Sequence, residues 1–133
     1  MSTADDFLGT MNRERHYNMK ASLSAAYYAM YNSLYAVLSK IGLKCEIHAC
    51  TLECIPSLLS SHYSKEDLIS IQKALEAREI SHYRADEVVA DKDKSFVLSR
   101  APFFLNKSKE VLASLNQIDI EVIRKKVKIY MKK

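Results

Sequence analysis

The segment Lys20–Gly42, KASLSAAYYAMYNSLYAVLSKIG, decides the fold of this chain. Its larger apolar side chains recur every three or four residues, which predicts one buried stripe on an α-helix. The stripe consists of Leu23, Ala26, Tyr27, Met30, Tyr31, Leu34, Tyr35, Leu38 and Ile41. A second stripe of small residues consists of Ala25, Ala29, Ser33 and Ala36. Small side chains let a neighbouring helix come close, so we expect a central helix with partners on two sides.

The composition of the whole chain favours an all-α protein. The 133 residues include only two glycines and two prolines, and long helices with short loops explain that better than a sheet. We predict one domain over residues 1–133, built as an antiparallel up-and-down bundle of four main helices plus a short C-terminal helix. The net charge of +4 permits an anionic partner but does not require one.

Local signals predict where the helices begin and end. Residues 1–10 resemble a short leader, and the first helix is expected from about Met11 to Ser39, with Gly42 as its stop. Ser64 offers an N-cap for a helix reaching about Val88. The other helices are predicted over residues 47–60, over residues 91–115 with a kink at Pro102, and from a cap at Asp119 onward.

The uncharged stretch from Ala21 to Ser39 raises the question of a membrane span. Its serines, its tyrosines and Asn32 would face hydrocarbon, and its apolar residues keep helical periodicity, so we expect no membrane span. The N-terminus has no secretory pattern, and three cysteines, an odd number, suggest reduced thiols. We therefore predict a cytoplasmic protein.

The predicted third helix changes character near its end. Its apolar face begins with Leu68, Ile71 and Leu75. The next positions on that face are Arg78 and His82. A buried arginine costs several kcal/mol, of the order of 3–5, if it is unpaired. There are two interpretations. Either this end of the helix faces solvent or the side chains pair structurally with an acid such as Glu53, or else Arg78 and His82 line a pocket. In a pocket, arginine binds phosphate and histidine moves protons near neutral pH.

Three segments together resemble the HEPN family, the higher eukaryotes and prokaryotes nucleotide-binding domains. They are AREISHY at 77–83, AAYYAMY at 25–31 and KCEIH at 44–48, within a likeness spanning roughly residues 12–115. The resemblance implies an up-and-down helical bundle, commonly a homodimer, often encoded beside a minimal nucleotidyltransferase. Several family members are toxins that cut RNA without metal, using an arginine and a histidine from each subunit.

The site residues follow from matching the family's motif to this chain. Nuclease members place four to six residues between arginine and histidine, whereas three separate Arg78 from His82 here. A shorter branch has arginine, two residues, alanine, aspartate and tyrosine. This chain has Ser81 and His82 in place of the alanine and aspartate, and keeps Tyr83. We therefore predict nucleotide or RNA binding through Arg78 and Tyr83, with Arg78 and His82 as candidate catalytic residues. Tyr28 is added to the binding residues for a different reason: it lies off the main apolar stripe, so we expect it near a ligand or a partner chain.

The resemblance and the residues lead to one main hypothesis and one alternative. The main one is a nucleotide- or RNA-binding protein, the toxin or substrate-binding partner of a nucleotidyltransferase, with metal-independent endoribonuclease activity as a further option. In that reaction Arg78 would hold the scissile phosphate and His82 would take the proton of the ribose 2′-hydroxyl. The alternative is a non-catalytic adaptor, in which a salt bridge can close off Arg78. No cofactor is expected.

Two further patterns are weaker. Cys45, His48, Cys50 and Cys54 could suggest zinc, but their spacing matches no familiar zinc site and free cysteines are usually buried, so we predict no metal. The last helix is rich in lysine and arginine, which usually means a solvated face and alternatively an RNA-backbone or protein-docking surface.

Overall fold

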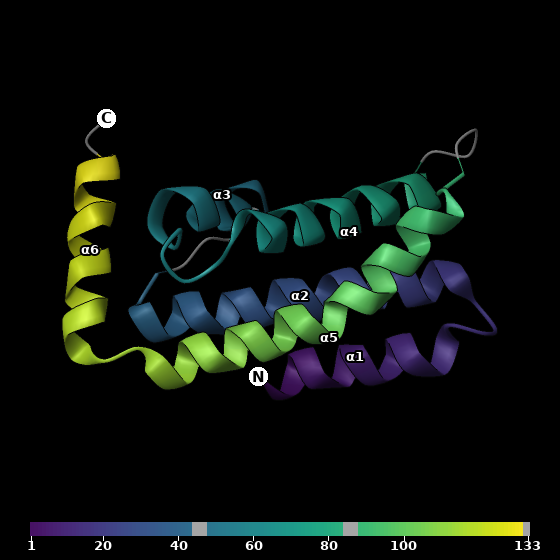
Figure 1. Ribbon diagram of the computed structural model, residues 1–133, viewed down its shortest axis with the longest axis horizontal. Helices are drawn as coiled ribbons and strands as arrows, with labels where there is room; N and C mark the ends of the chain where they lie inside the picture. The colour runs from purple at the N-terminus through teal and green to yellow at the C-terminus, as the bar shows by residue number, and fades with distance from the viewer. Residues whose placement is uncertain (44–47, 84–87, 132–133) are drawn as a thin grey trace.

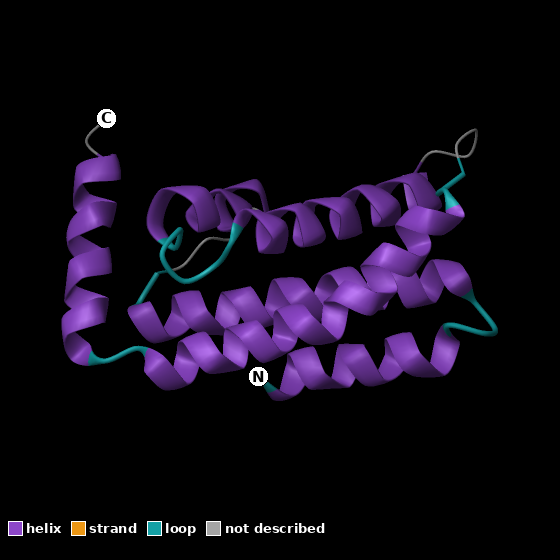
Figure 2. Cartoon of the chain, viewed as in Figure 1, coloured by secondary structure: helices purple, strands orange, loops and turns teal. Residues whose placement is uncertain are grey.

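The chain is all-helical in the ranges that the computed structural model describes, residues 1–43, 48–83 and 88–131. No strand occurs in these ranges (Figure 2), which confirms the predicted all-α class. The helices, labelled in Figure 1, are α1 (Ser2–Glu14), α2 (Met19–Ile41), α3 (His48–Leu58), α4 (Lys65–Tyr83), α5 (Asp91–Ser114) and α6 (Gln117–Met131).

Helix α2 lies at the centre of the molecule. It packs against α1, α5 and α4 (Figure 1), and twelve of its residues are buried. Both predicted stripes contribute, since Tyr27 and Leu34 of the large-residue stripe and Ala29 and Ser33 of the small-residue stripe are fully buried. The expectation that this helix has partners on more than one side is therefore confirmed.

The first predicted helix is wrong in its extent, because the chain breaks it in two. Asn18 has extended backbone angles, and its side chain accepts a hydrogen bond from the backbone N–H of Ala21 at 3.1 Å. This N-cap starts α2 and separates it from α1, and Tyr17 in the intervening turn is exposed.

The predicted short leader, residues 1–10, forms most of α1. Ala4 and Met11 are fully buried, and Phe7 and Leu8 pack against the core between them. These four positions have helical spacing, yet the polar residues and Gly9 among them obscured it. The helix is held to the neighbouring α2 by a hydrogen bond from the Ser22 hydroxyl to the Met11 carbonyl at 2.8 Å.

Helix α4 begins as predicted and ends earlier. The Ser64 backbone N–H donates to Asp67 Oδ2 at 2.8 Å, and the Asp67 N–H donates to Ser64 Oγ at 3.2 Å. This reciprocal pair is a capping box. The helix ends at Tyr83, and Val88, where we predicted its end, is exposed and lies outside it.

A group of buried hydroxyls joins α2, α5 and the connection between α3 and α4. Ser33 Oγ lies 3.0 Å from Ser108 Oγ, and Tyr63 Oη lies 2.8 Å from the same atom. The Ser33 hydroxyl also donates to the Met30 carbonyl at 2.7 Å. Each of these polar groups is buried with a partner, so the cluster satisfies the hydrogen-bonding demand of the interior.

Helix α6 lies across one end of the other helices (Figure 1). Asn116, not the predicted Asp119, precedes it as the N-cap, because Asn116 Oδ1 accepts from the Asp119 N–H at 2.9 Å. Arg124 fastens the helix to the end of α2 by donating from Nε to the Ile41 carbonyl at 2.7 Å. Of the helices described, none combines the length and hydropathy that crossing a bilayer requires.

Candidate functional site

Arg78 lies in a cage of tyrosine rings between α4 and α2. Its guanidinium carbon is 4.9 Å from the ring centre of Tyr28, 5.6 Å from that of Tyr83 and 5.9 Å from that of Tyr27. Each distance lies within the range of a cation–π attraction. The three rings therefore surround the guanidinium and can stabilise its positive charge.

The donors of this guanidinium are largely unused within the described residues. Nη2 donates to the hydroxyl of Tyr83 at 3.4 Å, which is a long hydrogen bond. The Nε atom is buried and has no hydrogen-bond partner. No carboxylate in the described ranges forms an ion pair with Arg78. The charge of Arg78 is therefore neutralised by no described acid.

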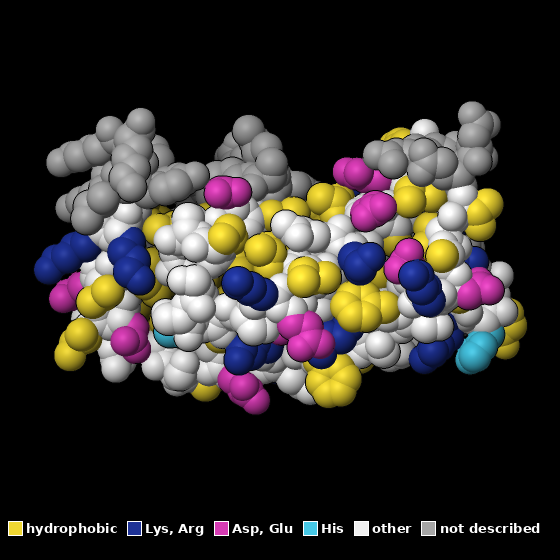
Figure 3. Space-filling view, turned by 45° about the horizontal axis from the view of Figure 1, so that its top comes forward, with side chains coloured by type: hydrophobic (Ala, Val, Ile, Leu, Met, Phe, Trp, Pro, Cys, Tyr) yellow, Lys and Arg dark blue, Asp and Glu magenta, His cyan; other side chains and the backbone are white. Residues whose placement is uncertain are grey.

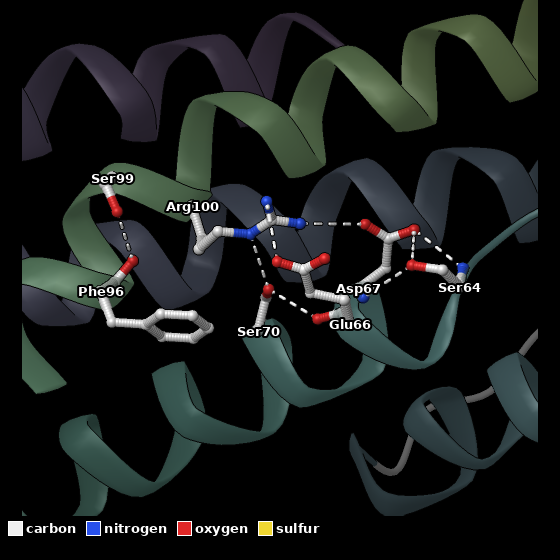
Figure 4. Close-up of polar contacts among 7 residues, drawn as sticks. All are labelled: Ser64, Glu66, Asp67, Ser70, Phe96, Ser99 and Arg100. Carbon is white, nitrogen blue, oxygen red and sulfur yellow. Dashed lines mark hydrogen bonds and ion pairs between the residues drawn. The ribbon is translucent and has the colours of Figure 1, made fainter.

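Arg100 on α5 shows how the same fold treats an arginine with a structural role (Figure 4). Its Nε donates to Ser70 Oγ at 3.0 Å, and its two terminal nitrogens lie 3.4 Å from an Asp67 carboxylate oxygen and 3.5 Å from one of Glu66. Three residues of α4 thus provide hydrogen-bond and ion-pair partners for the guanidinium of Arg100. Arg78, also half-buried, lacks such partners, so the predicted salt bridge that would close it off is absent from the described residues.

The tyrosines around Arg78 differ in burial. Tyr27 is fully buried, Tyr28 is half-buried and Tyr83 is exposed over 70% of its surface. Burial raises the pKa of the Tyr27 hydroxyl, Tyr31 raises the pKa further, and the charge of Arg78 lowers it. Tyr28 also stacks on Phe7 of α1, with ring centres 5.4 Å apart. The cage thus passes from the core, at Tyr27, to solvent, at Tyr83.

His82 and Tyr83 form the last turn of α4 and are both exposed. Their ring centres lie 6.2 Å apart. The imidazole is accessible to a ligand from solvent, and no hydrogen bond joins it to Arg78 in the part of the chain that is described. Arg78 and His82 occupy positions i and i+4 of α4, so their side chains project from one side of the helix.

The structure therefore brings together three of the four predicted site residues. Arg78, Tyr28 and Tyr83 are in contact, and His82 lies beside Tyr83 at the edge of the cluster. Tyr27 was predicted only as part of the buried stripe of the central helix. The signal for its second role was the position of Tyr27 on the apolar stripe of α2, the stripe that packs on α4.

No metal centre is evident in the described residues, where no group of three or more histidine, cysteine, aspartate or glutamate side chains comes together. Cys54, from the weak zinc pattern, is buried. The side chains of Cys45, His48 and Cys50 lie outside the described residues.

The comparisons with known proteins identify no family for this chain. Neither the comparison with family models nor that with curated proteins finds a match.

Proposed function

We propose that this protein is a HEPN-like domain that binds nucleotides or RNA through Arg78. The observation that carries the proposal is a guanidinium held by three tyrosine rings, with no described acid neutralising it. Arginine is the side chain best suited to bind phosphate, because two of its N–H groups can donate in parallel. Tyr28 and Tyr83 supply aromatic faces and hydroxyls for a base or a ribose.

The proposal includes the architecture that the resemblance implies. The four main helices of the antiparallel up-and-down bundle would be α1, α2, α4 and α5, with α6 as the added C-terminal helix. This membership differs from the predicted one, because the first predicted helix is two helices and α3, predicted as a main helix over residues 47–60, lies between α2 and α4. The active unit that the resemblance implies is a homodimer, and the partner protein that it implies is a minimal nucleotidyltransferase. In this pair the present chain is the toxin or the substrate-binding partner.

RNA cleavage is the second candidate function, and His82 favours it. The imidazole is exposed and lies one turn beyond Arg78. It can take the proton from a ribose 2′-hydroxyl, whose oxygen then attacks the phosphorus and displaces the 5′-oxygen of the next nucleotide, leaving a 2′,3′-cyclic phosphate. Arg78 would stabilise the charge that builds on the phosphate oxygens. A histidine of the second subunit would protonate the leaving oxygen.

A non-catalytic adaptor is the competing function. It requires only that the surface of the helices bind a protein, and it gives the tyrosine cage no ligand. Arg100, the half-buried arginine that joins α5 to α4, has two acidic partners. The lack of a described acid at Arg78 therefore favours an anionic ligand over the adaptor.

Binding of fluorescent single-stranded RNA tests the proposal. We expect Arg78→Ala to weaken binding about tenfold or more, because a charge-assisted hydrogen bond to phosphate is lost. Lys73→Ala is the matched control on the same helix, since Lys73 makes only an exposed ion pair with Asp93 at 3.5 Å. Circular dichroism confirms that both variants remain helical. Equal affinity in the wild type and Arg78→Ala would contradict the proposal and leave the adaptor.

Incubation of total RNA with the protein and EDTA separates cleavage from binding. Products that disappear in both Arg78→Ala and His82→Ala establish the nuclease. Intact RNA with tight, Arg78-dependent binding establishes a binding protein without turnover. Light scattering tests whether the protein is a homodimer. Co-purification with a nucleotidyltransferase encoded by a neighbouring gene tests the partner.

A further inference from the structure

The turn from α1 to α2 and the start of α5 lie at the same end of the molecule (Figure 1). Residues of these segments line a groove. Its volume is about 670 Å³, which falls within the usual range of sites for small molecules and cofactors. The lining residues come from α1 and its turn, from the first residue of α2, and from the first half of α5. None of them belongs to the tyrosine cage around Arg78, so the groove is a separate feature.

The rim of this groove is cationic. Arg15 and His16 lie in the turn, are exposed, and form no ion pair with any described residue. Lys94 of α5 lines the same groove, and its ammonium lies 3.6 Å from the fully exposed carboxylate of Asp91. Figure 3 shows lysine and arginine side chains and a histidine at this end, with acidic side chains among them. The basic groups thus outnumber the single carboxylate of the groove.

The rest of the groove provides an apolar floor and polar walls. Met19 and Pro102 are half-buried and offer thioether and aliphatic surface to the groove, and the buried Met11 and Leu98 complete its floor. The polar walls carry the amide of Asn12 and the hydroxyls of Ser95 and Ser99. The Ser99 hydroxyl donates to the Phe96 carbonyl at 2.9 Å and keeps its lone pairs free to accept.

We propose that this groove binds a nucleoside monophosphate. The phosphate binds to Arg15 of the turn and Lys94 of α5, which supply charge-assisted hydrogen bonds. The planar base lies on the apolar surface of Met19 and Pro102. Asn12 and Ser95 contact the ribose hydroxyls, which can both donate and accept. This site is distinct from Arg78 and remains if the proposed function fails.

The combination of a cationic rim and an apolar floor selects this ligand class. An inorganic phosphate would use the rim alone and leave the floor exposed to water. An apolar molecule without charge would leave Arg15 and Lys94 with no partner for their charge except the exposed Asp91. A nucleotide fills both parts of the groove, and burying its base adds apolar contact area to the ionic contacts.

Calorimetric titration of the full chain with AMP and UMP tests this site, with inorganic phosphate as the comparison ligand. We expect saturable binding of the nucleotides, and Kd values at least about fivefold higher in Arg15→Gln and in Lys94→Gln. Lys92→Gln is the matched control, because Lys92 is an exposed neighbour of Lys94 that does not line the groove. Ser99→Glu adds a negative charge to the exposed wall and is expected to abolish binding.

The outcomes separate the groove from the tyrosine cage. Nucleotide binding that weakens in Arg15→Gln and persists in Arg78→Ala supports the groove. Binding that is lost only in Arg78→Ala overturns the groove while supporting the proposed function. Absence of saturation overturns the groove as well, and so does inorganic phosphate binding as tightly as AMP, because the floor then contributes nothing.

Discussion

Gly42 ends the central helix in a conformation that other residues avoid. Its φ of 91° lies in the left-handed region, and its backbone N–H bonds to the carbonyls of Leu38 and Ser39. The N–H of Leu43 bonds to the Leu38 carbonyl at 2.9 Å, which completes a Schellman-type cap. The guanidinium of Arg124 occupies the space where a Cβ atom at position 42 would lie. The glycine thus allows both the cap and the docking of α6.

Gly42→Ala should lower the free energy of unfolding by about 1–2 kcal/mol from the backbone conformation alone. Displacement of Arg124 from the Ile41 carbonyl adds to the loss. Urea unfolding followed by circular dichroism measures the change. Gly9→Ala is the opposite control, since Gly9 lies inside α1, where alanine should stabilise the helix by roughly 0.5–1 kcal/mol.

A double-mutant cycle with Arg124→Ala separates the two effects of the substitution. If the clash with the guanidinium matters, Gly42→Ala costs less stability when Arg124 is already alanine. A Gly42→Ala variant as stable as the wild type would show that this cap is not strained.

Single residues were predictable where one local rule applies. Gly42 as a stop and Ser64 as a cap follow from backbone preference and side-chain reach, and both are confirmed. Arg78 was singled out because a charged residue continues an apolar stripe, and the structure places it half-buried among tyrosines. Its binding role stays a prediction.

At the scale of elements, Arg100 joins α5 to the first turns of α4 (Figure 4). It bonds to Ser70 and pairs with Asp67, which is 6% exposed and also caps its own helix. The Ser70 hydroxyl in turn donates to the Glu66 carbonyl at 2.8 Å. One guanidinium therefore supports both the packing of two helices and the start of one of them.

Arg100→Gln should destabilise the protein by about 1–3 kcal/mol, because the buried Asp67 loses its cation and Ser70 loses a donor. Thermal and urea unfolding measure the loss. Lys109→Gln is the control on the same helix, since Lys109 pairs with Asp5 at 2.9 Å and both side chains are about half exposed. An exposed pair of this kind contributes about 0.2–1 kcal/mol at most. Equal effects of the two substitutions would contradict the structural role of Arg100.

Element boundaries were predictable in part. The start of α5 at Asp91 and the start of α4 after Ser64 agree with the prediction. The break at residues 15–18 was not predicted. Asn18 acts as an N-cap only because the chain turns before it, and the charged residues before and after the turn are as compatible with a continuous helix as with a break. Pro102 lies inside α5, where the helix continues around it.

At the scale of the whole molecule, two buried tyrosines link stability to alkaline pH. Burial raises the pKa of Tyr27 and of Tyr63, although the Ser108 hydroxyl lowers that of Tyr63 by its hydrogen bond. In the unfolded chain both titrate near the ordinary value of about 10. Above that pH the unfolded state loses protons that the native state keeps, so the free energy of unfolding falls as pH rises.

Urea unfolding measured from neutral pH to about pH 11 checks this expectation. Stability should be fully retained below pH about 10 and decline above it, with a shallower decline in Tyr63→Phe. Tyr17→Phe is the control, because Tyr17 is 89% exposed and its hydroxyl meets solvent in both states. A decline equally steep in Tyr63→Phe and Tyr17→Phe would contradict the role of burial.

The arrangement of the whole molecule was the least predictable level. The all-α class was predictable from composition and periodicity, because both are local properties of the sequence. The groove at Arg15 and Lys94 is lined by a turn and by a helix that lies far from it in the sequence. Neither segment carries a sequence motif, so nothing in the sequence predicted the groove. His16 is an exposed residue of the turn, and only the packing of α5 against α1 brings the start of α5 near that turn.

The buried hydroxyls of Ser33, Tyr63 and Ser108 depend on one another for hydrogen bonds, so a substitution at one of these distant positions affects the others. Ser108 serves both of the others, so an alanine at this position would deprive Tyr63 and Ser33 of a bond at once. Replacing all three by apolar residues of matching size would remove the demand altogether. A designer who redesigns this interior must therefore change these positions jointly or leave them as they are.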